Sequence, residues 1–329
     1  MVRRESAIYS GQTICLATHL HGRPTVFIVA IVAMLFPTVQ ADSNRVLYVD
    51  AAAVGKNDGS SWGNAYRYLQ DALVTPRNSQ SPVEIRVAQG IYKPDQSSAN
   101  PNGTRNRSAT FTLLDNVIIS AGFAGGNAPE PDARDIGLYQ TILSGDLAGN
   151  DASVLDPRDL LTEPTRAENS GAVVTGGASS RSAVLDGFTI TAGNAMRTRI
   201  GGGAGLYLSG TTLAPCCPSI RNCTFLENVG GAGSAVAVSS GYPELVDCTF
   251  IRNAASVEGG AVHISGYSSS PSSTCQFIIK RCTFDNNYAG QTGGAIQIWG
   301  FPPIIEGSTF RRNIAQKGGS IYLASYGAP

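Results

Sequence analysis

The residues that come closest to a catalytic pair are Asp247 and Arg281. Each precedes a cysteine in a different copy of a recurring Cys-Thr-Phe segment, where the other copies carry Asn222 and Gly307. Hydrolysis of a glycosidic bond needs two carboxyl groups flanking that bond. A lyase acting on an acidic sugar would instead need a base such as Arg281 beside a cation held by carboxylates. Because no second carboxylate recurs at this position, a surface ion pair is the simpler interpretation and no catalytic residue is predicted.

Two loops carry oxygen donors that could bind calcium. Residues 57–59 read Asn-Asp-Gly, and a second loop contains Asp146, Asn150 and Asp151. Calcium is bound by carboxylate, amide and backbone oxygens. Neither loop has EF-hand spacing, and Asn, Asp and Gly are also ordinary turn residues. We therefore expect no cofactor and no metal ligand, with calcium as the open alternative.

A row of side chains in the short apolar strands suits a carbohydrate ligand. Equivalent positions of four strands carry Tyr207, His263, Gln297 and Tyr322. An aromatic ring offers an apolar face on which a sugar ring can stack. We therefore predict this row as the ligand face. The chain has 24 basic and 24 acidic residues, and this balance argues against a nucleic-acid partner.

The cysteines fall into two groups. Those of the first group directly precede Thr-Phe and are predicted to be buried thiols: Cys223, Cys248 and Cys282. Cys216, Cys217 and Cys275 lie in longer loops, and the copy between these loops has only a short corner around Gly241. A disulfide from Cys216 or Cys217 to Cys275, arching over that corner, is a hypothesis for an exported protein.

Apart from the two candidate calcium loops, these residues belong to a repeat in the C-terminal half. A Thr-Phe pair is followed, three residues after the Phe, by Asn. The phenylalanines are Phe225, Phe250, Phe284 and Phe310, and the asparagines are Asn228, Asn253, Asn287 and Asn313. Successive phenylalanines lie 25, 34 and 26 residues apart. A period in this range indicates a solenoid.

The local pattern decides the kind of solenoid. Inward and outward residues alternate as they do in strands, and no copy has helical spacing. We therefore predict an all-β chain, a single-stranded right-handed parallel β-helix, in which equivalent residues stack about 4.8 Å apart. Glycine pairs such as Gly259-Gly260 would form one corner. The Asn row is expected at another corner, in left-handed geometry.

The repeat resembles a known group of sequences. Gly-Gly-Ala-Val/Ile followed by Cys-Thr-Phe-x-x-Asn is similar to the repeats of bacterial right-handed β-helix proteins, including the polymorphic outer-membrane proteins, and more widely to the pectate-lyase-like superfamily. The resemblance covers residues 184–329 most clearly. It implies the fold and a secreted or surface location. It implies no single activity, since this scaffold carries lyases, hydrolases, esterases, adhesins and inert surface proteins.

The rest of the chain divides at residue 41. Residues 1–41 are predicted to be a secretory signal peptide, with a basic start, an apolar run over 26–36 and a small-residue cleavage site. An uncleaved membrane anchor or a buried strand is the alternative. The β-helix is expected over 42–329, with an N-terminal segment and cap over 42–110. A helix over 62–74, with Trp62, Leu69 and Leu73 on one face, would cover the open end of the stack.

These observations predict a secreted or cell-surface protein, associated with the outer membrane. Its expected role is binding or structural, toward a polysaccharide or another cell-envelope component, with no transmembrane segment in the mature chain. The alternative is a carbohydrate-active enzyme, either a polysaccharide lyase or a glycoside hydrolase, using Asp247 and Arg281. Two or more carboxylates in one groove on adjacent coils would favour the enzyme.

Overall fold

The computed structural model describes residues 8–9, 12–13, 45–78, 81–196, 202–211, 213–265, 275–300 and 302–324. Contacts divide the chain into two units, residues 1–41 and 42–329. In the first unit, β1 (Ile8–Tyr9) and β2 (Gln12–Thr13) form an antiparallel pair. Most of the predicted signal peptide lies outside the described residues, so it stays a prediction.

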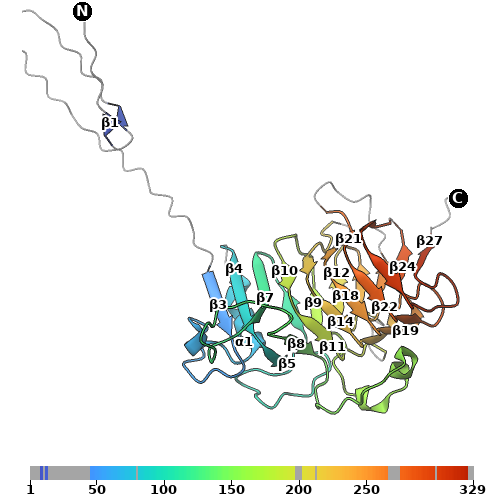
Figure 1. Cartoon of the computed structure of the whole chain (residues 1–329), viewed down its shortest axis with the longest axis horizontal. Helices are drawn as coiled ribbons and strands as arrows, with labels where there is room; N and C mark the ends of the chain where they lie inside the picture. The colour runs from blue at the N-terminus through green and yellow to red at the C-terminus, as the bar shows by residue number, and fades with distance from the viewer. Residues whose placement is uncertain are drawn as a thin grey trace, which may run out of the picture. The chain divides into compact units, whose positions relative to one another are not determined.

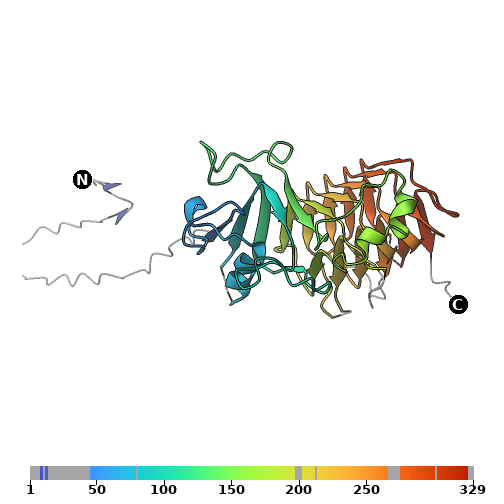
Figure 2. The same ribbon diagram turned by 90° about the horizontal axis from the view of Figure 1, so that it is seen from below.

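The second unit is a parallel β-helix, as the repeat predicted (Figures 1 and 2). The first sheet contains β3 (Arg45–Val49), β4 (Val83–Ala88), β7 (Val117–Phe123), β10 (Val184–Asp186), β13 (Ser219–Arg221), β17 (Glu244–Val246), β21 (Ile278–Lys280) and β25 (Ile304–Glu306). The second contains β5 (Gly90–Tyr92), β8 (Thr141–Ser144), β11 (Thr189–Thr191), β14 (Thr224–Leu226), β18 (Thr249–Ile251), β22 (Thr283–Asp285) and β26 (Thr309–Arg311).

The third sheet contains β6 (Phe111–Leu113), β9 (Val174–Gly176), β12 (Leu206–Ser209), β16 (Val236–Ser239), β20 (Val262–Ser265), β24 (Ile296–Trp299) and β27 (Ile321–Ala324). A short fourth sheet contains β15 (Val229–Ala232), β19 (Ala254–Glu258) and β23 (Tyr288–Ala289). Each coil supplies one strand to each long sheet, so a residue pairs with its equivalent in the next coil.

The core consists of stacked equivalent residues. The rings of Phe225, Phe250, Phe284 and Phe310 follow one another with centroids 5.0, 4.5 and 4.8 Å apart and planes within 4° of parallel. In earlier coils the same inward column continues with Ile190, Leu143 and Tyr92. The column therefore changes from mixed side chains to one repeated ring along the axis.

The asparagine row lies inside the coil rather than at the left-handed corner. Asn228, Asn253 and Asn287 are fully buried. The residues with positive φ are the preceding ones, such as Glu227 at 52° and Arg252 at 49°. The prediction of left-handed asparagines was therefore wrong by one position, because a buried amide can bond to neighbouring coils while the polar residue before it takes the left-handed corner.

The asparagines form a continuous hydrogen-bonded ladder. The Nδ2 of Asn253 donates to the Phe225 carbonyl (2.9 Å) and to Oδ1 of Asn287 (3.0 Å). Its Oδ1 accepts from the backbone N–H and the Nδ2 of Asn228, both at 3.1 Å. Each amide thus satisfies buried polar groups in both adjacent coils, which no apolar residue could do.

The glycine corners agree with the prediction. Gly259 and Gly293 have φ values of 57° and 64°. A Cβ at Gly259 would lie 2.3 Å from the carbonyl oxygen of Val262, so only glycine fits this close approach.

The predicted helix over 62–74 is shorter and broken. A 3-10 turn, η1 (Trp62–Asn64), is separated from α1 (Leu69–Val74), which continues into the 3-10 turn η2 (Thr75–Asn78). Between them the backbone N–H of Tyr66 donates to the Tyr48 carbonyl at 2.9 Å. The segment around Tyr66 thus pairs with the edge of β3 as extended chain. The helical periodicity of the sequence did not reveal this pairing.

The short helix still covers the N-terminal end of the stack (Figure 1). It contacts β3 and β6, the terminal strands of two sheets. Leu69, Ala72 and Leu73 are buried in the main core. Trp62 instead packs outside that core against Phe123 and Tyr48.

A long excursion separates β8 from β9. It contains two 3-10 turns, η3 (Pro157–Leu161) and η4 (Pro164–Arg166). Leu160 packs against Val229 and Ala254, so the excursion lies against the fourth sheet, beside coils that come much later in sequence (Figure 2).

Candidate functional site

Asp247 and Arg281 form a bidentate ion pair on the surface. Nε and Nη2 of Arg281 donate to the two carboxylate oxygens of Asp247, both at 2.6 Å. These hydrogen bonds lower the pKa of Asp247. Both residues have positive φ, 54° and 51°, so they occupy the exposed corner. The pair holds Asp247 ionised, whereas a general acid needs a raised pKa.

The predicted ligand row is aligned but not continuous. Tyr207, Ala237, His263, Gln297 and Tyr322 are direct partners in successive strands of the third sheet. The two tyrosines and His263 are partly exposed, but Gln297 is fully buried. Gln297 is therefore removed from the accessible ligand face.

Trp299 and His263, which lie beside Gln297 in β24 and β20, both contact Glu258. The indole Nε1 of Trp299 donates to Oε2 of Glu258 at 2.9 Å, and His263 Nε2 lies 3.2 Å from the same oxygen. The hydrogen bond with His263 is the main cause that lowers the pKa of Glu258. Sequence reasoning missed Trp299, although its position two residues after Gln297 places it on the same outward face.

The structure pairs Cys217 with Cys275, and their Cα atoms are 6.0 Å apart. Cys216 remains a buried thiol, and its carbonyl accepts from the backbone N–H of Tyr242 in the short coil between. Cys216 also forms a parallel β-bridge with Gly241. The disulfide therefore spans the corner at Gly241.

The thiol ladder of Cys223, Cys248 and Cys282 is buried and reduced. Burial raises the pKa of Cys223 to about 12, and that of Cys216 to about 11. Burial also raises the pKa of Cys248, whereas the hydrogen bond with Cys248 lowers the pKa of Cys282. Since the thiolate is the reactive form, Cys216, Cys223 and Cys248 fill space rather than perform chemistry.

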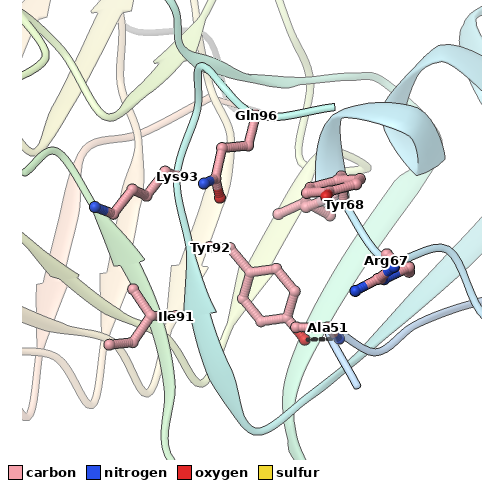
Figure 3. Close-up of a pocket in the computed structure, with 8 residues that line it drawn as sticks. Ala51, Arg67, Tyr68, Ile91, Tyr92, Lys93 and Gln96 are labelled. Carbon is pink, nitrogen blue, oxygen red and sulfur yellow. Dashed lines mark hydrogen bonds between the residues drawn. The ribbon is translucent and has the colours of Figure 1, made fainter. Parts of the chain in front are cut away.

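A small hollow near the capping helix is lined by basic and aromatic side chains (Figure 3). Its volume is about 50 Å³. The hydroxyl of buried Tyr92 donates to the Ala88 carbonyl (3.1 Å) and accepts from the Ala51 N–H (3.3 Å). Neither Arg67 nor Lys93 forms an ion pair with a carboxylate of the described residues. The Nζ of Lys93 donates to the Leu147 carbonyl at 3.4 Å and points away from Arg67 in Figure 3. Arg67 is therefore the cation that could attract an anionic group to the hollow.

The first candidate calcium loop uses its donors in turns. Oδ1 of Asn57 accepts from the Arg67 N–H at 2.8 Å, and Oδ1 of Asp58 accepts from the Ser60 N–H at 3.0 Å. These bonds explain the Asn-Asp-Gly sequence without a metal.

The second loop brings carboxylates together with one that sequence reasoning missed. Asp146, Asp151 and Glu168 offer oxygens within 4.8 Å of one another. Asn150 is exposed and contacts Asp146 through its backbone N–H, at 3.2 Å. Burial raises the pKa of Asp151 to about 6. Glu168 could not be found from spacing because the excursion carries it back to the loop.

One coil of the β-helix matches a known protein-family model. Residues 281–298 match the model of the Chlamydia polymorphic membrane protein repeat. This match confirms the resemblance there. The segment runs from Arg281 through the Phe284 and Asn287 positions to Ile298 in β24. No curated protein and no solved structure matches the chain. Within the part of the chain that the structure describes, no helix is long and apolar enough to cross a membrane.

Proposed function

We propose that this chain is a cell-surface β-helix protein with a binding role, which recognises an extended polysaccharide of the cell envelope along its third sheet. The repeat match over residues 281–298 supports the surface location, because the family's name describes a membrane protein. The fold supports an elongated binding surface rather than a deep pocket.

The observation that carries this proposal is the spacing of the row on the third sheet. Tyr207, His263 and Tyr322 lie on every second coil. Stacked coils place such residues about 10 Å apart. This distance suits an extended glycan that presents a sugar ring to every second coil. Stacking on the tyrosine rings would supply affinity, and His263 would supply a polar contact.

The hollow at Arg67 and Lys93 favours an acidic glycan. Arg67 and Lys93 have no carboxylate partner among the described residues, so they can attract a carboxylate or sulfate. Pairing with such a group would break no existing ion pair. Substituting both residues with alanine should weaken binding to acidic polysaccharides and leave binding to neutral ones unchanged.

The proposal is tested by affinity electrophoresis of the full chain in gels that contain neutral, uronate-rich or sulfated polysaccharides. We expect retardation by at least one glycan, with Kd rising about tenfold in Tyr207→Ala and in Tyr322→Ala. Thr249→Ala, on the outward row of the second sheet, is the matched control and should bind normally.

Two outcomes contradict the proposal. Equal retardation of wild type and both tyrosine variants would place binding elsewhere, and no retardation by any glycan would exclude it. The same gels are assayed for new reducing ends and unsaturated uronates. Cleavage that disappears in Asp247→Ala or Arg281→Ala would establish the carbohydrate-active enzyme instead.

A further inference from the structure

We infer that Asp146, Asp151 and Glu168 form a calcium site that ties the excursion between β8 and β9 to the stack. This inference concerns a part of the molecule outside the proposed glycan surface, and it stands without that proposal. One carboxylate oxygen from each residue lies within 4.8 Å of the others. Two oxygens on opposite sides of a calcium ion, each bonded at 2.3–2.6 Å, are separated by about this distance.

The buried amide of Asn169 points to a ligand independently of the acidic cluster. Asn169 is fully buried, and its Nδ2 donates to Oδ2 of Asp151 at 2.9 Å. Its Oδ1, at the same end of the side chain, is also buried and has no hydrogen-bond donor. A buried amide oxygen without a donor is unfavourable, and a cation would satisfy it.

Two carboxylate oxygens share this condition. Oδ1 of Asp151 and Oε1 of Glu168 are buried without a donor. Three oxygens of one neighbourhood are therefore buried without a hydrogen-bond donor among the described residues. Such a concentration of unsatisfied acceptors is expected where a cation completes the structure.

The remaining contacts hold the ligands in place. Oδ2 of Asp151 is occupied by Asn169 and by Nη1 of the buried Arg166, at 3.3 Å, which leaves Oδ1 free. Oδ1 of Asp146 accepts from the Gly149 N–H at 2.6 Å. Arg166 also pairs with Glu227, so it cannot neutralise the whole cluster. Asp146 and Glu168 have no cationic partner among the described residues.

The donor set identifies the ion. All available donors are oxygens, which favours calcium or magnesium over zinc or copper. The ligands come from an irregular loop, which fits the variable geometry of calcium better than the strict octahedron of magnesium. A hollow of about 260 Å³, lined by Asp146, Asp151 and Arg166, gives access to water that can complete the coordination shell.

The test compares calcium binding of the full chain after EDTA treatment with that of Glu168→Gln and Asp151→Asn. Glu168 makes no hydrogen bond or ion pair with a described residue, so Glu168→Gln keeps every contact except the proposed one. We expect calcium to raise the Tm of the wild type and to displace bound terbium, with Kd of about 0.1–1 mM. Each variant should weaken binding roughly tenfold or more.

Asp58→Asn is the matched control, since Asp58 lies in the other acidic loop and is fully exposed. It should retain the full response to calcium. In EDTA, Glu168→Gln should unfold at the wild-type temperature or higher, because a neutral amide relieves an uncompensated carboxylate. Absence of a calcium response in the wild type, or a response that survives in both site variants, would overturn the inference. A response lost in Asp58→Asn would also overturn it, since it would place the ion in the other loop.

Discussion

The coils before β12 and those after it use the same inward columns in different ways. In the later coils one side chain repeats, as in the column of Phe225, Phe250 and Phe284. In the earlier coils that column holds Tyr92, Leu143 and Ile190. The later coils are thus stabilised by stacking of identical rings, whereas each earlier coil packs a different side chain at the same position.

Polar chemistry is distributed in the opposite way. In the later coils, charges at the short corners are paired between neighbours, as in Asp247 with Arg281. The segments between the strands of the earlier coils hold the basic hollow and the acidic cluster around Asp151. The regular coils supply the scaffold, and the clustered acidic and basic groups lie in the insertions. Among the described residues, buried side-chain atoms without a hydrogen-bond partner occur in both regions, for example at Asn169 and at Gln297.

The largest expected effect is on the phenylalanine column. Phe250→Ala should lower the free energy of unfolding by about 4 kcal/mol, because it leaves a cavity between two rings. The double variant with Phe284→Ala should cost about 1 kcal/mol less than the sum of the single changes, because both remove the same stacking contact. Urea denaturation monitored by circular dichroism measures this coupling.

The matching pair in the earlier coils is Leu143→Ala with Ile190→Ala. These aliphatic side chains are direct neighbours on adjacent coils, so their changes should also couple, but by less than the phenylalanine pair, about 0.5 kcal/mol, because no ring stacking is lost. An equally large coupling in both pairs would remove the distinction between the two regions.

The asparagine ladder should give the next largest effect. Asn253→Ala leaves the Phe225 carbonyl and the N–H of Asn228 without their side-chain partner in a buried place. We expect a loss of about 3 kcal/mol. Asn313→Ala, at the half-buried end of the ladder, should cost less because water can replace its bonds. Equal losses at the two positions, measured by urea denaturation, would show that burial does not set the cost.

The regular region could be predicted from sequence because its information is local and repeated. The Thr-Phe and Cys positions alternate with period two, which determines both the strands and their register. The same repetition identifies Asn253 as a stacked residue. It does not reveal whether Asn or the residue before it takes the left-handed corner, since both are polar.

The parts that could not be predicted depend on contacts between residues far apart in sequence. By its position in the strand, Gln297 should point outward, yet it is buried. Its neighbour Trp299 contacts Glu258, which lies 41 residues earlier in the sequence. Glu168 joins Asp151 because the excursion folds back on the later coils. The broken helix has the same origin, since β3 recruits Tyr66. Insertions have no repeat from which such contacts can be deduced.

The smallest expected effect concerns how ion pairs between neighbouring coils respond to acid. Asp285 has a side chain only 8% exposed and pairs with Arg311 and Arg312, while Asp247 is 39% exposed and pairs with Arg281. The arginines lower the pKa of both carboxyl groups, Arg312 chiefly for Asp285. A lowered pKa stabilises the fold above the unfolded pKa, near 3.9, and this contribution is lost as the pH falls through the lower folded value.

Asp285→Asn should therefore remove about 1 kcal/mol of stability at pH 7, and the difference from wild type should shrink as the pH falls below the unfolded value and through the lower folded pKa. Asp247→Asn should remove less than about 0.5 kcal/mol, because solvent screens the exposed pair. Urea denaturation of both variants between neutral and acidic pH makes the comparison. A larger loss for Asp247→Asn would mean that burial does not strengthen these ion pairs, and the later coils would then owe their stability to the inward columns alone.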